Sequence, residues 1–379
     1  MSKIFNGSGR QSFIDFARGL VMVVMAWDHV SNFWHLLHHG GEGVLGQMPP
    51  YASTLWFLER FVSHFCAPSF VFLAGTVLAF STASRLERGV SQREISLHII
   101  IRGIVLLILE VVLVSPAFEM PSYYFGVIAC IGVCFILFSV IRFVPKNIIL
   151  VLSLFTVLFH GSLSLEWIPM TTIANRYLRV ILHEPNFDSW PYVGLYPIIP
   201  WIGVMGLGWY FGLVIRQLNV PFSKLRNALI LTGVSSIGLF FVVRSLRSFG
   251  NLLPRRGDTI VDWLYVSKYP PSVAFLLWGL GGMCLFLALG LWLQEKEVKN
   301  IVSDGLHDIG KTPLFYYLTH LWLFRLRMPT PPPPVPPPFP LEMWQTLIFW
   351  VIGNVVLWQL CKRYLQFKRA HPNSPLKYI

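Results

Sequence analysis

Charged residues are scarce in this chain. Asp, Glu, Lys and Arg together make up 13% of its 379 residues, whereas hydrophobic residues make up 54%. A typical soluble domain has about 25% charged residues. A chain of this composition is expected to cross a membrane several times, and a water-soluble enzyme is excluded.

Paired cysteines and a cleavable leader are also missing. The sequence has five cysteines, all within or at the ends of apolar segments, and none forms a Cys-x-x-Cys pair. We expect them to be buried packing residues rather than disulfides. Residues 1–10 lack the apolar core and cleavage site of a signal peptide, so we expect the first helix to be retained.

The formal net charge of +12 does not call for a nucleic-acid partner. Most Lys and Arg residues lie in short loops beside apolar segments, which is typical of the cytoplasmic loops of membrane proteins. The basic stretches are 1–10, 84–94, 142–146, 216–226 and the tail 362–379. With ten crossings these stretches fall on one side, so both termini are predicted to be cytoplasmic.

The apolar segments predict an all-α fold, a polytopic membrane helix bundle of about ten transmembrane helices. No internal repeat of fixed period is found, and residues 1–379 are interpreted as a single domain in the lipid bilayer. The predicted spans are 12–37, 54–83, 95–114, 123–143, 147–165, 192–216, 227–246, 270–293, 312–327 and 343–365.

Three connecting segments have unusual compositions. Residues 244–268 carry five Lys or Arg residues on the predicted outer side, against the usual bias, and ligand contact is one explanation. Residues 294–311, rich in Glu, Lys and Asp, are expected to form a solvated cytoplasmic connector. The proline-rich outer loop 329–340 is expected to form a polyproline II rod, as a stiff spacer or as a docking ligand.

The first predicted span carries Asp15, Arg18, Asp28 and His29. A charged side chain at mid-bilayer costs roughly 2.5–3.5 kcal/mol, so such residues are candidates for function. Arg18 and His29 are eleven positions apart. On a helix that spacing returns to within about 20° of the same face, roughly 16 Å further along the axis.

Each of these polar residues has two interpretations. Arg18 either snorkels to the headgroups beside Asp15 or binds phosphate groups arriving from the cytoplasm. His29 either donates an interhelical hydrogen bond or serves as a general base. Asp28 points about 100° away from His29, so it either binds substrate or pairs with a neighbouring helix.

Polar residues elsewhere extend this set. Arg102 is predicted at the level of the first-span arginine, so that two arginines converge on one phosphate site. Lys268 is either a snorkelling anchor or a site residue, and His320 either completes the polar cluster or bonds a neighbouring helix. His35 and His39 are four residues apart, but no Glu at metal-ligand spacing accompanies them, so no metal site is predicted.

The spacing Arg18-x10-His29 on a first membrane helix resembles the signature of the acyltransferase-3 proteins and of the wider transmembrane acyltransferase superfamily. Residues 12–19, 68–75, 268–272 and 313–320 resemble bacterial members of the heparan-α-glucosaminide N-acetyltransferase family. In the second of these stretches, a proline should kink the helix and Gly75 should allow close backbone approach. The resemblance runs from about residue 10 to the basic tail.

The resemblance implies a multi-pass acyltransferase of the bacterial cytoplasmic (inner) membrane. Such proteins transfer an acetyl group from cytosolic acetyl-CoA to an amine or hydroxyl, typically of a saccharide, and a homodimer is compatible with it. In lysosomal members Asn stands at the position of His29, and the proposed catalytic His lies near the end of the same segment, where this chain has His38 and His39. We favour His29 as the base, with His39 second.

We predict that the phosphates of acyl-CoA bind at the cytoplasmic mouth and that the pantetheine arm runs along the first helix. His29 then activates the acceptor or accepts the acyl group itself, while Asp28, His39 and Lys268 face the acceptor from outside. The candidate cofactor-binding residues are Arg18, Arg102 and Lys268, and the candidate catalytic residues are His29, Asp28 and His39. The alternatives are a proton-coupled secondary transporter and a structural membrane protein.

Overall fold

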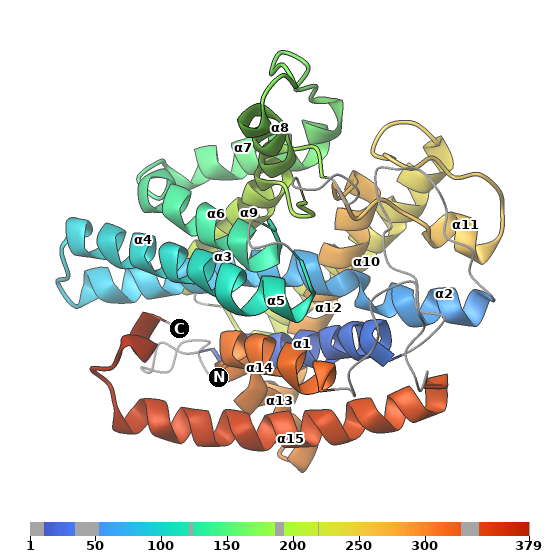
Figure 1. The fold of residues 1–379 in the computed structure, drawn as a ribbon. Helices are drawn as coiled ribbons and strands as arrows, with labels where there is room; N and C mark the ends of the chain where they lie inside the picture. The colour runs from blue at the N-terminus through green and yellow to red at the C-terminus, as the bar shows by residue number, and fades with distance from the viewer. Residues whose placement is uncertain are drawn as a thin grey trace.

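The computed structural model describes residues 11–34, 53–120, 124–185, 193–218, 220–326 and 341–378. Within these ranges the regular elements are helices, accompanied by two isolated β-bridges, so the predicted all-α fold is confirmed (Figure 1). His35, His38, His39 and the proline-rich loop 329–340 lie outside the described residues.

Every predicted span contains a helix. These helices are α1 (Ser12–Trp34), α2 (Thr54–Phe61), α3 (Cys66–Glu87), α4 (Gln92–Leu109), α6 (Val127–Ile141), α7 (Lys146–Phe159), α9 (Ile198–Gln217), α10 (Phe222–Leu246), α12 (Val273–Glu295), α14 (Pro313–Arg325) and α15 (Met343–Ala370). A π-helical turn (Glu110–Val114) and α5 (Ser115–Ala117) continue α4. Three further helices, α8 (Ile173–Leu182), α11 (Ile260–Leu264) and α13 (Ile301–Lys311), lie outside the predicted spans.

The prediction of about ten membrane crossings is not confirmed. Among the described residues, six helical segments are long and apolar enough to cross a membrane, namely those that contain α3, α4, α9, α10, α12 and α15. Helices α6, α7 and α14 have 15, 14 and 13 residues. Helices of that size are about 20–23 Å long, shorter than the roughly 30 Å of hydrocarbon. The cytoplasmic position of both termini stays a prediction.

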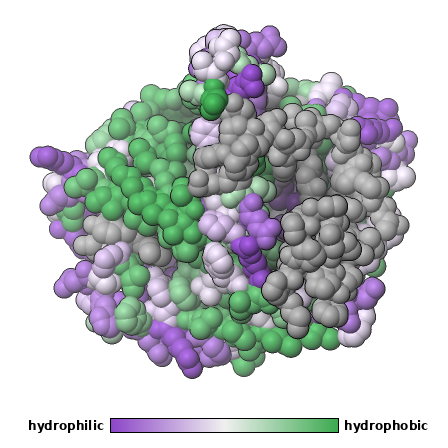
Figure 2. All heavy atoms as spheres, in the orientation of Figure 1, coloured by the Kyte–Doolittle hydropathy of each residue, from purple (hydrophilic) through white to green (hydrophobic). Residues whose placement is uncertain are grey.

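Helix α1 lies at the centre of the bundle. It packs against α3, α12, α13, α14 and α15, and the start of α1 and the end of α15 lie at the same end of the molecule (Figure 1). The helical segment that contains α3 is mostly enclosed, because 72% of its most apolar 18-residue stretch is buried. The corresponding share for α15 is 22%. Apolar side chains accordingly cover the outer surface over α4, α6 and α15 (Figure 2).

The segment before α3 bends as its sequence predicts. A short 3₁₀ turn, Val62–Phe65, separates α2 from α3, and Pro68 follows in the first turn of α3. Proline has no N–H to donate and clashes with the carbonyl four residues before it, so the regular helix is interrupted at this point. The five cysteines, including Cys66 at the start of α3, are free and buried, as predicted.

Glycine residues allow two pairs of helices to approach closely. A Cβ atom at Gly75 of α3 would lie 2.2 Å from the carbonyl oxygen of Met205 in α9, which confirms the predicted close approach. Between α1 and α13, a Cβ at Gly19 would lie 1.9 Å from the carbonyl oxygen of Leu306, and one at Gly310 would lie 1.7 Å from that of Asp15. Small residues at such crossings let two helix backbones come into contact.

The prediction of a solvated connector at 294–311 is wrong for its second half. Residues 301–311 form α13, and Ser303, Gly305, Ile309 and Gly310 are buried. The charged residues of α13 predict a polar segment, but Gly310 packs against the backbone of α1 and Gly305 lies against Trp358 of α15. The contact with α1 fixes the position of the residues that begin α14.

One of the unexpected outer cations has a structural role. Arg244, which is 1% exposed, lies in the last turn of α10, next to the segment 249–265. Its guanidinium donates hydrogen bonds of 2.6–3.0 Å to the carbonyl oxygens of Leu253, Asp262, Trp263 and Tyr265 and to Oδ1 of Asn251. The cation therefore holds the turns of this segment together, and ligand contact is not needed to explain it.

The α1–α13 contact makes a stability prediction. Gly310→Ala should lower the free energy of unfolding by about 1–3 kcal/mol, because the added methyl group has to displace the backbone of α1. Gly238→Ala in α10 is the matched control, since no atom lies within 4 Å of a Cβ at that site. It should leave stability unchanged or raise it by up to about 1 kcal/mol through helix propensity. Unfolding of both variants in detergent tests this, and equal stabilities would contradict it.

Candidate active site

One face of α1 lines two neighbouring cavities. Arg18 and Met22 line the first, and Met25, His29 and Asn32 line the second. These residues are spaced by four, three, four and three positions, which is the repeat of a single helix face. Because α1 is unbroken from Ser12 to Trp34, Arg18 and His29 lie on one face, as predicted.

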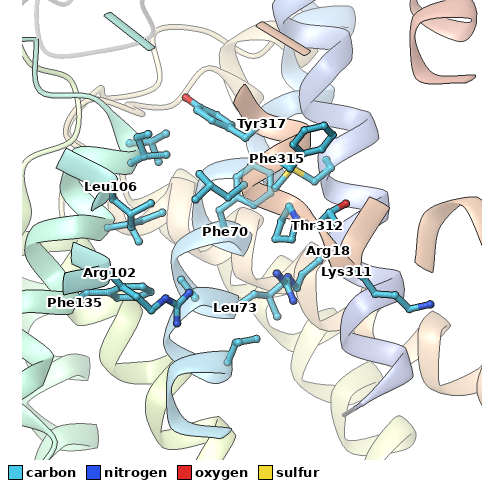
Figure 3. A pocket seen from close by; sticks show the side chains of 18 of the residues that line it. Arg18, Phe70, Leu73, Arg102, Leu106, Phe135, Lys311, Thr312, Phe315 and Tyr317 are labelled. Atoms are coloured by element: carbon cyan, nitrogen blue, oxygen red, sulfur yellow. The ribbon is translucent and has the colours of Figure 1, made fainter. Parts of the chain in front are cut away.

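The first cavity, here called the cationic cavity, has a volume of about 200 Å³ and is lined by residues of α1, α3, α4, α6, α13, α14 and α15. Most of its lining is apolar. Its cationic side chains are Arg18, Arg102, Lys311 and Lys368. Figure 3 shows Arg18, Arg102 and Lys311 at the same end of this cavity, away from Tyr317.

The two predicted arginines are held in different ways. Arg102 lies over the ring of Phe135, with its guanidinium carbon 5.1 Å from the ring centroid. Arg18 is 3.4 Å from the carboxylate of Asp15 one turn earlier on α1. The structure thus brings both arginines into one cavity, with the Arg18–Asp15 contact that the sequence suggested. Together with Lys311 and Lys368, they make a site suited to an anion with several charges.

The second cavity, here called the histidine cavity, has a volume of about 320 Å³. Its ionisable lining residues include Asp28, His29, Arg60 and Lys268, and tyrosine side chains form much of the remaining wall. Lys268 is 5% exposed and lies 5.3 Å from the ring centroid of Tyr269. It therefore lies with His29, apart from the arginines with which the sequence grouped it.

Asp28 is paired with a neighbouring helix. Its carboxylate forms an ion pair with Arg60 of α2, and the same guanidinium donates a 2.9 Å hydrogen bond to the hydroxyl of Ser63. The side chains of Arg60 and Asp28 are 5% and 12% exposed. Of the two interpretations of Asp28, the structure favours pairing, which also explains why the carboxylate is tolerated beside His29.

His29 is in contact with a second histidine from α14. Its Nδ1 lies 2.6 Å from Nε2 of His320, and the two rings stack with centroids 4.9 Å apart. The Nδ1 of His320 lies 3.0 Å from the carbonyl oxygen of Tyr316, which can only accept a hydrogen bond. Neutral His320 must then accept at Nε2, so His29 donates from Nδ1 and keeps Nε2 as its basic nitrogen.

Three residues line both cavities. They are Phe70 of α3, Val127 of α6 and Tyr317 of α14. The cavities therefore adjoin at these side chains. The ring of Tyr317 lies 6.4 Å from that of His29, which places the junction directly beside the histidine pair.

Sequence reasoning missed two of the cations. Lys311 was read as part of a connector and Lys368 as part of the basic tail, yet both line the cationic cavity. One available signal was the position of Lys311 directly before Thr312 and Pro313 at the start of an apolar helix. Within the described ranges, no group of three or more His, Cys, Asp or Glu residues is placed to hold a metal ion.

Comparison with known proteins shows the family of this chain. The sequence model for the catalytic region of heparan-alpha-glucosaminide N-acetyltransferases matches residues 10–244. The matched region includes α1, whose one face lines both cavities, and it covers more than half of the chain. The chain therefore belongs to the heparan-alpha-glucosaminide N-acetyltransferase catalytic family.

A curated relative points the same way. The mouse heparan-alpha-glucosaminide N-acetyltransferase is 23% identical to this chain over 193 residues. That region is 48% of this chain and 27% of the mouse protein, so the match spans only about a quarter of the relative's length.

The Asp28–Arg60 pair makes a prediction that is independent of activity. Asp28→Asn leaves the cation of Arg60 without its carboxylate and should lower the free energy of unfolding by about 3–5 kcal/mol. Adding Arg60→Met to Asp28→Asn should recover at least half of that loss, because neither position of the former pair then carries a charge. Chemical unfolding of the four proteins in a double-mutant cycle measures the coupling.

Glu87→Gln is the matched control for this cycle. It breaks the ion pair with Arg216, in which the Glu87 side chain is 65% exposed. Its cost should be under about 1 kcal/mol. A loss for Asp28→Asn as small as that for Glu87→Gln would contradict the structural role of the pair.

Proposed function

We propose that this protein is an integral-membrane acetyltransferase. It takes an acetyl or other short acyl group from cytosolic acyl-CoA and delivers it to an amine or hydroxyl of a saccharide at or across the membrane. The observation that carries the proposal is the single face of α1 that runs from a cationic cavity to a histidine cavity. Family membership favours this activity over a transporter or a scaffold.

The donor would bind with its nucleotide at the cationic cavity. Acyl-CoA carries a diphosphate and a 3′-phosphate, so its nucleotide end is a compact polyanion. Arginine offers a planar fork that matches phosphate oxygens, and lysine adds mobile charge. Arg18, Arg102, Lys311 and Lys368 are available on four different helices for this purpose.

The pantetheine arm would follow the face of α1. Arg18 and His29 are eleven residues apart, a rise of about 16 Å on an α-helix. An extended pantetheine arm covers a comparable length, so phosphates at Arg18 leave the thioester near His29. The apolar lining of the cationic cavity suits the uncharged arm.

The reaction would exchange one acyl bond for another. The acceptor nitrogen or oxygen forms a bond to the acyl carbon, the carbon–sulfur bond breaks, and the acceptor's proton passes to Nε2 of His29. The CoA sulfur leaves as a thiolate and is protonated afterwards. His320 would hold His29 in the required tautomer and share the positive charge that develops.

The other ionisable residues would serve the acceptor side. Lys268 would place positive charge near the thioester oxygen as negative charge builds on it. Asp28, bound to Arg60, would shape the cavity wall rather than carry the proton. We keep His39 as the second candidate base, and we propose the bacterial cytoplasmic membrane as the location.

Donor binding by the two arginines can be measured directly. Arg18→Gln and Arg102→Gln should each weaken the binding of acetyl-CoA to purified protein by about 10- to 150-fold, the equivalent of about 1.5–3 kcal/mol for a charge-assisted hydrogen bond. S-Acetylpantetheine lacks the nucleotide phosphates, so it should bind the wild type and both variants with the same dissociation constant.

Arg142→Gln is the control arginine, because its guanidinium bonds Gln92 and Ser96 away from both cavities. It should bind acetyl-CoA as the wild type does. Absence of acetyl-CoA binding by the wild type, or unchanged binding by Arg18→Gln, would contradict the proposed donor site.

The base is tested by transfer kinetics. His29→Ala should lower kcat for transfer to a glucosamine acceptor by about 10²- to 10⁴-fold, because the acceptor loses its proton acceptor. The dissociation constant for acetyl-CoA should change less than twofold, since the phosphates bind elsewhere. His39→Ala should retain wild-type kcat. Full activity in His29→Ala together with loss in His39→Ala would move the assignment to His39.

A further inference from the structure

The two cavities adjoin at three bulky side chains, none of which carries a charged group. Phe70, Val127 and Tyr317 come from three different helices and are the described residues common to both linings. Figure 3 shows Phe70 and Tyr317 toward one end of the cationic cavity, with Arg102, Arg18 and Lys311 toward the other. We call these three side chains the neck.

The neighbours of the neck divide cleanly between the two cavities. On α3, Cys66 and Ala67 line the histidine cavity, whereas Leu73 and Ala74 line the cationic cavity. On α1, Met25 lines the histidine cavity and Met22 lines the cationic cavity. The two named residues of α3 before Phe70 and the two after it therefore line different cavities, and Phe70 marks the boundary.

The neck is held in place by packing. Tyr317 is 6% exposed, and its ring lies 5.5 Å from that of His320 as well as beside His29. Val127 begins α6, a helix whose start is fixed by a hydrogen bond from Ala129 N to the carboxylate of Glu110. Side chains confined in this way yield little to a larger ligand, because packed interiors resist changes in volume.

We propose that the neck selects the donor by the width of its acyl group. This inference rests on the proposed donor path, in which the acyl group is the first part of acyl-CoA to pass from the cationic cavity to His29. An unbranched acyl group has about the cross-section of the arm that follows it. An acyl group branched at the carbon next to the thioester is wider and meets Phe70 and Tyr317.

The neck has a second consequence for the donor. Its three residues carry no cation, so the junction itself offers the nucleotide phosphates no partner between the two cavities. The charged end of the donor is retained on one side while the thioester reaches the other. The three neck residues thus limit both how far the donor enters toward His29 and how wide its acyl group can be.

The experiment compares acetyl-CoA with isobutyryl-CoA as donors for wild type, Phe70→Leu and Phe70→Ala. The ratio of kcat/KM for isobutyryl to that for acetyl should rise at least tenfold in Phe70→Ala and less in Phe70→Leu, as the neck widens. Phe72→Ala is the matched control. Phe72 lies two residues along α3, faces Phe211 of α9 and lines neither cavity, so its donor ratio should equal that of the wild type.

A binding measurement separates this inference from the proposed function. S-Ethyl-CoA and S-isobutyl-CoA are thioethers that cannot transfer a group, and the wild type should bind the ethyl form at least tenfold more tightly. Phe70→Ala should reduce that preference. If the protein transfers acetyl groups but Phe70→Ala leaves the isobutyryl-to-acetyl ratio of kcat/KM unchanged, selection by the neck is overturned. The proposed function then stays intact. Failure of the wild type to bind either thioether would overturn both.

Discussion

Charge inside an apolar helix bundle has to be paired, and this constraint shapes the surroundings of α1. Asp15 lies against Arg18, Asp28 against Arg60, and His29 against His320. The first pair lies within one turn of α1, the second joins α1 to α2, and the third joins α1 to α14. An ionised side chain left alone at this depth would cost several kcal/mol, so the helices that enclose α1 cannot be arranged independently of its polar face.

Glycine contacts link α1 to the helix that supplies a lysine to the cationic cavity. Gly19 and Gly310 bring the backbones of α1 and α13 into contact. Because α13 ends at Lys311, that contact also sets the position of the lysine beside Arg18 in the cationic cavity. Two residues without side chains therefore help to determine where two cations meet. The same device joins α3 to α9 at Gly75, behind the wall that carries Phe70.

The sequence predicted what depends on local periodicity. The helices, the shared face of Arg18 and His29, and the close approach at Gly75 all follow from spacing along one element. It did not predict that Lys368 joins the two arginines or that Lys268 lies in a different cavity from them, because both depend on which helices become neighbours. The predicted number of crossings is not confirmed, for a related reason. Apolar composition identifies a helix, whereas crossing a bilayer also requires length that several of these helices do not have.

The two cavities differ in chemistry in a way that suits group transfer. The cationic cavity can compensate the charge of a polyanion, whereas the histidine cavity holds His29 beside a paired carboxylate and a buried lysine. Joining them directly would let phosphate compete for the cations near the base and would perturb its proton affinity. The apolar residues Phe70 and Val127 keep the two electrostatic environments apart while leaving them adjacent. In the proposed function, substitutions in one cavity can then alter donor binding while substitutions in the other alter the transfer step.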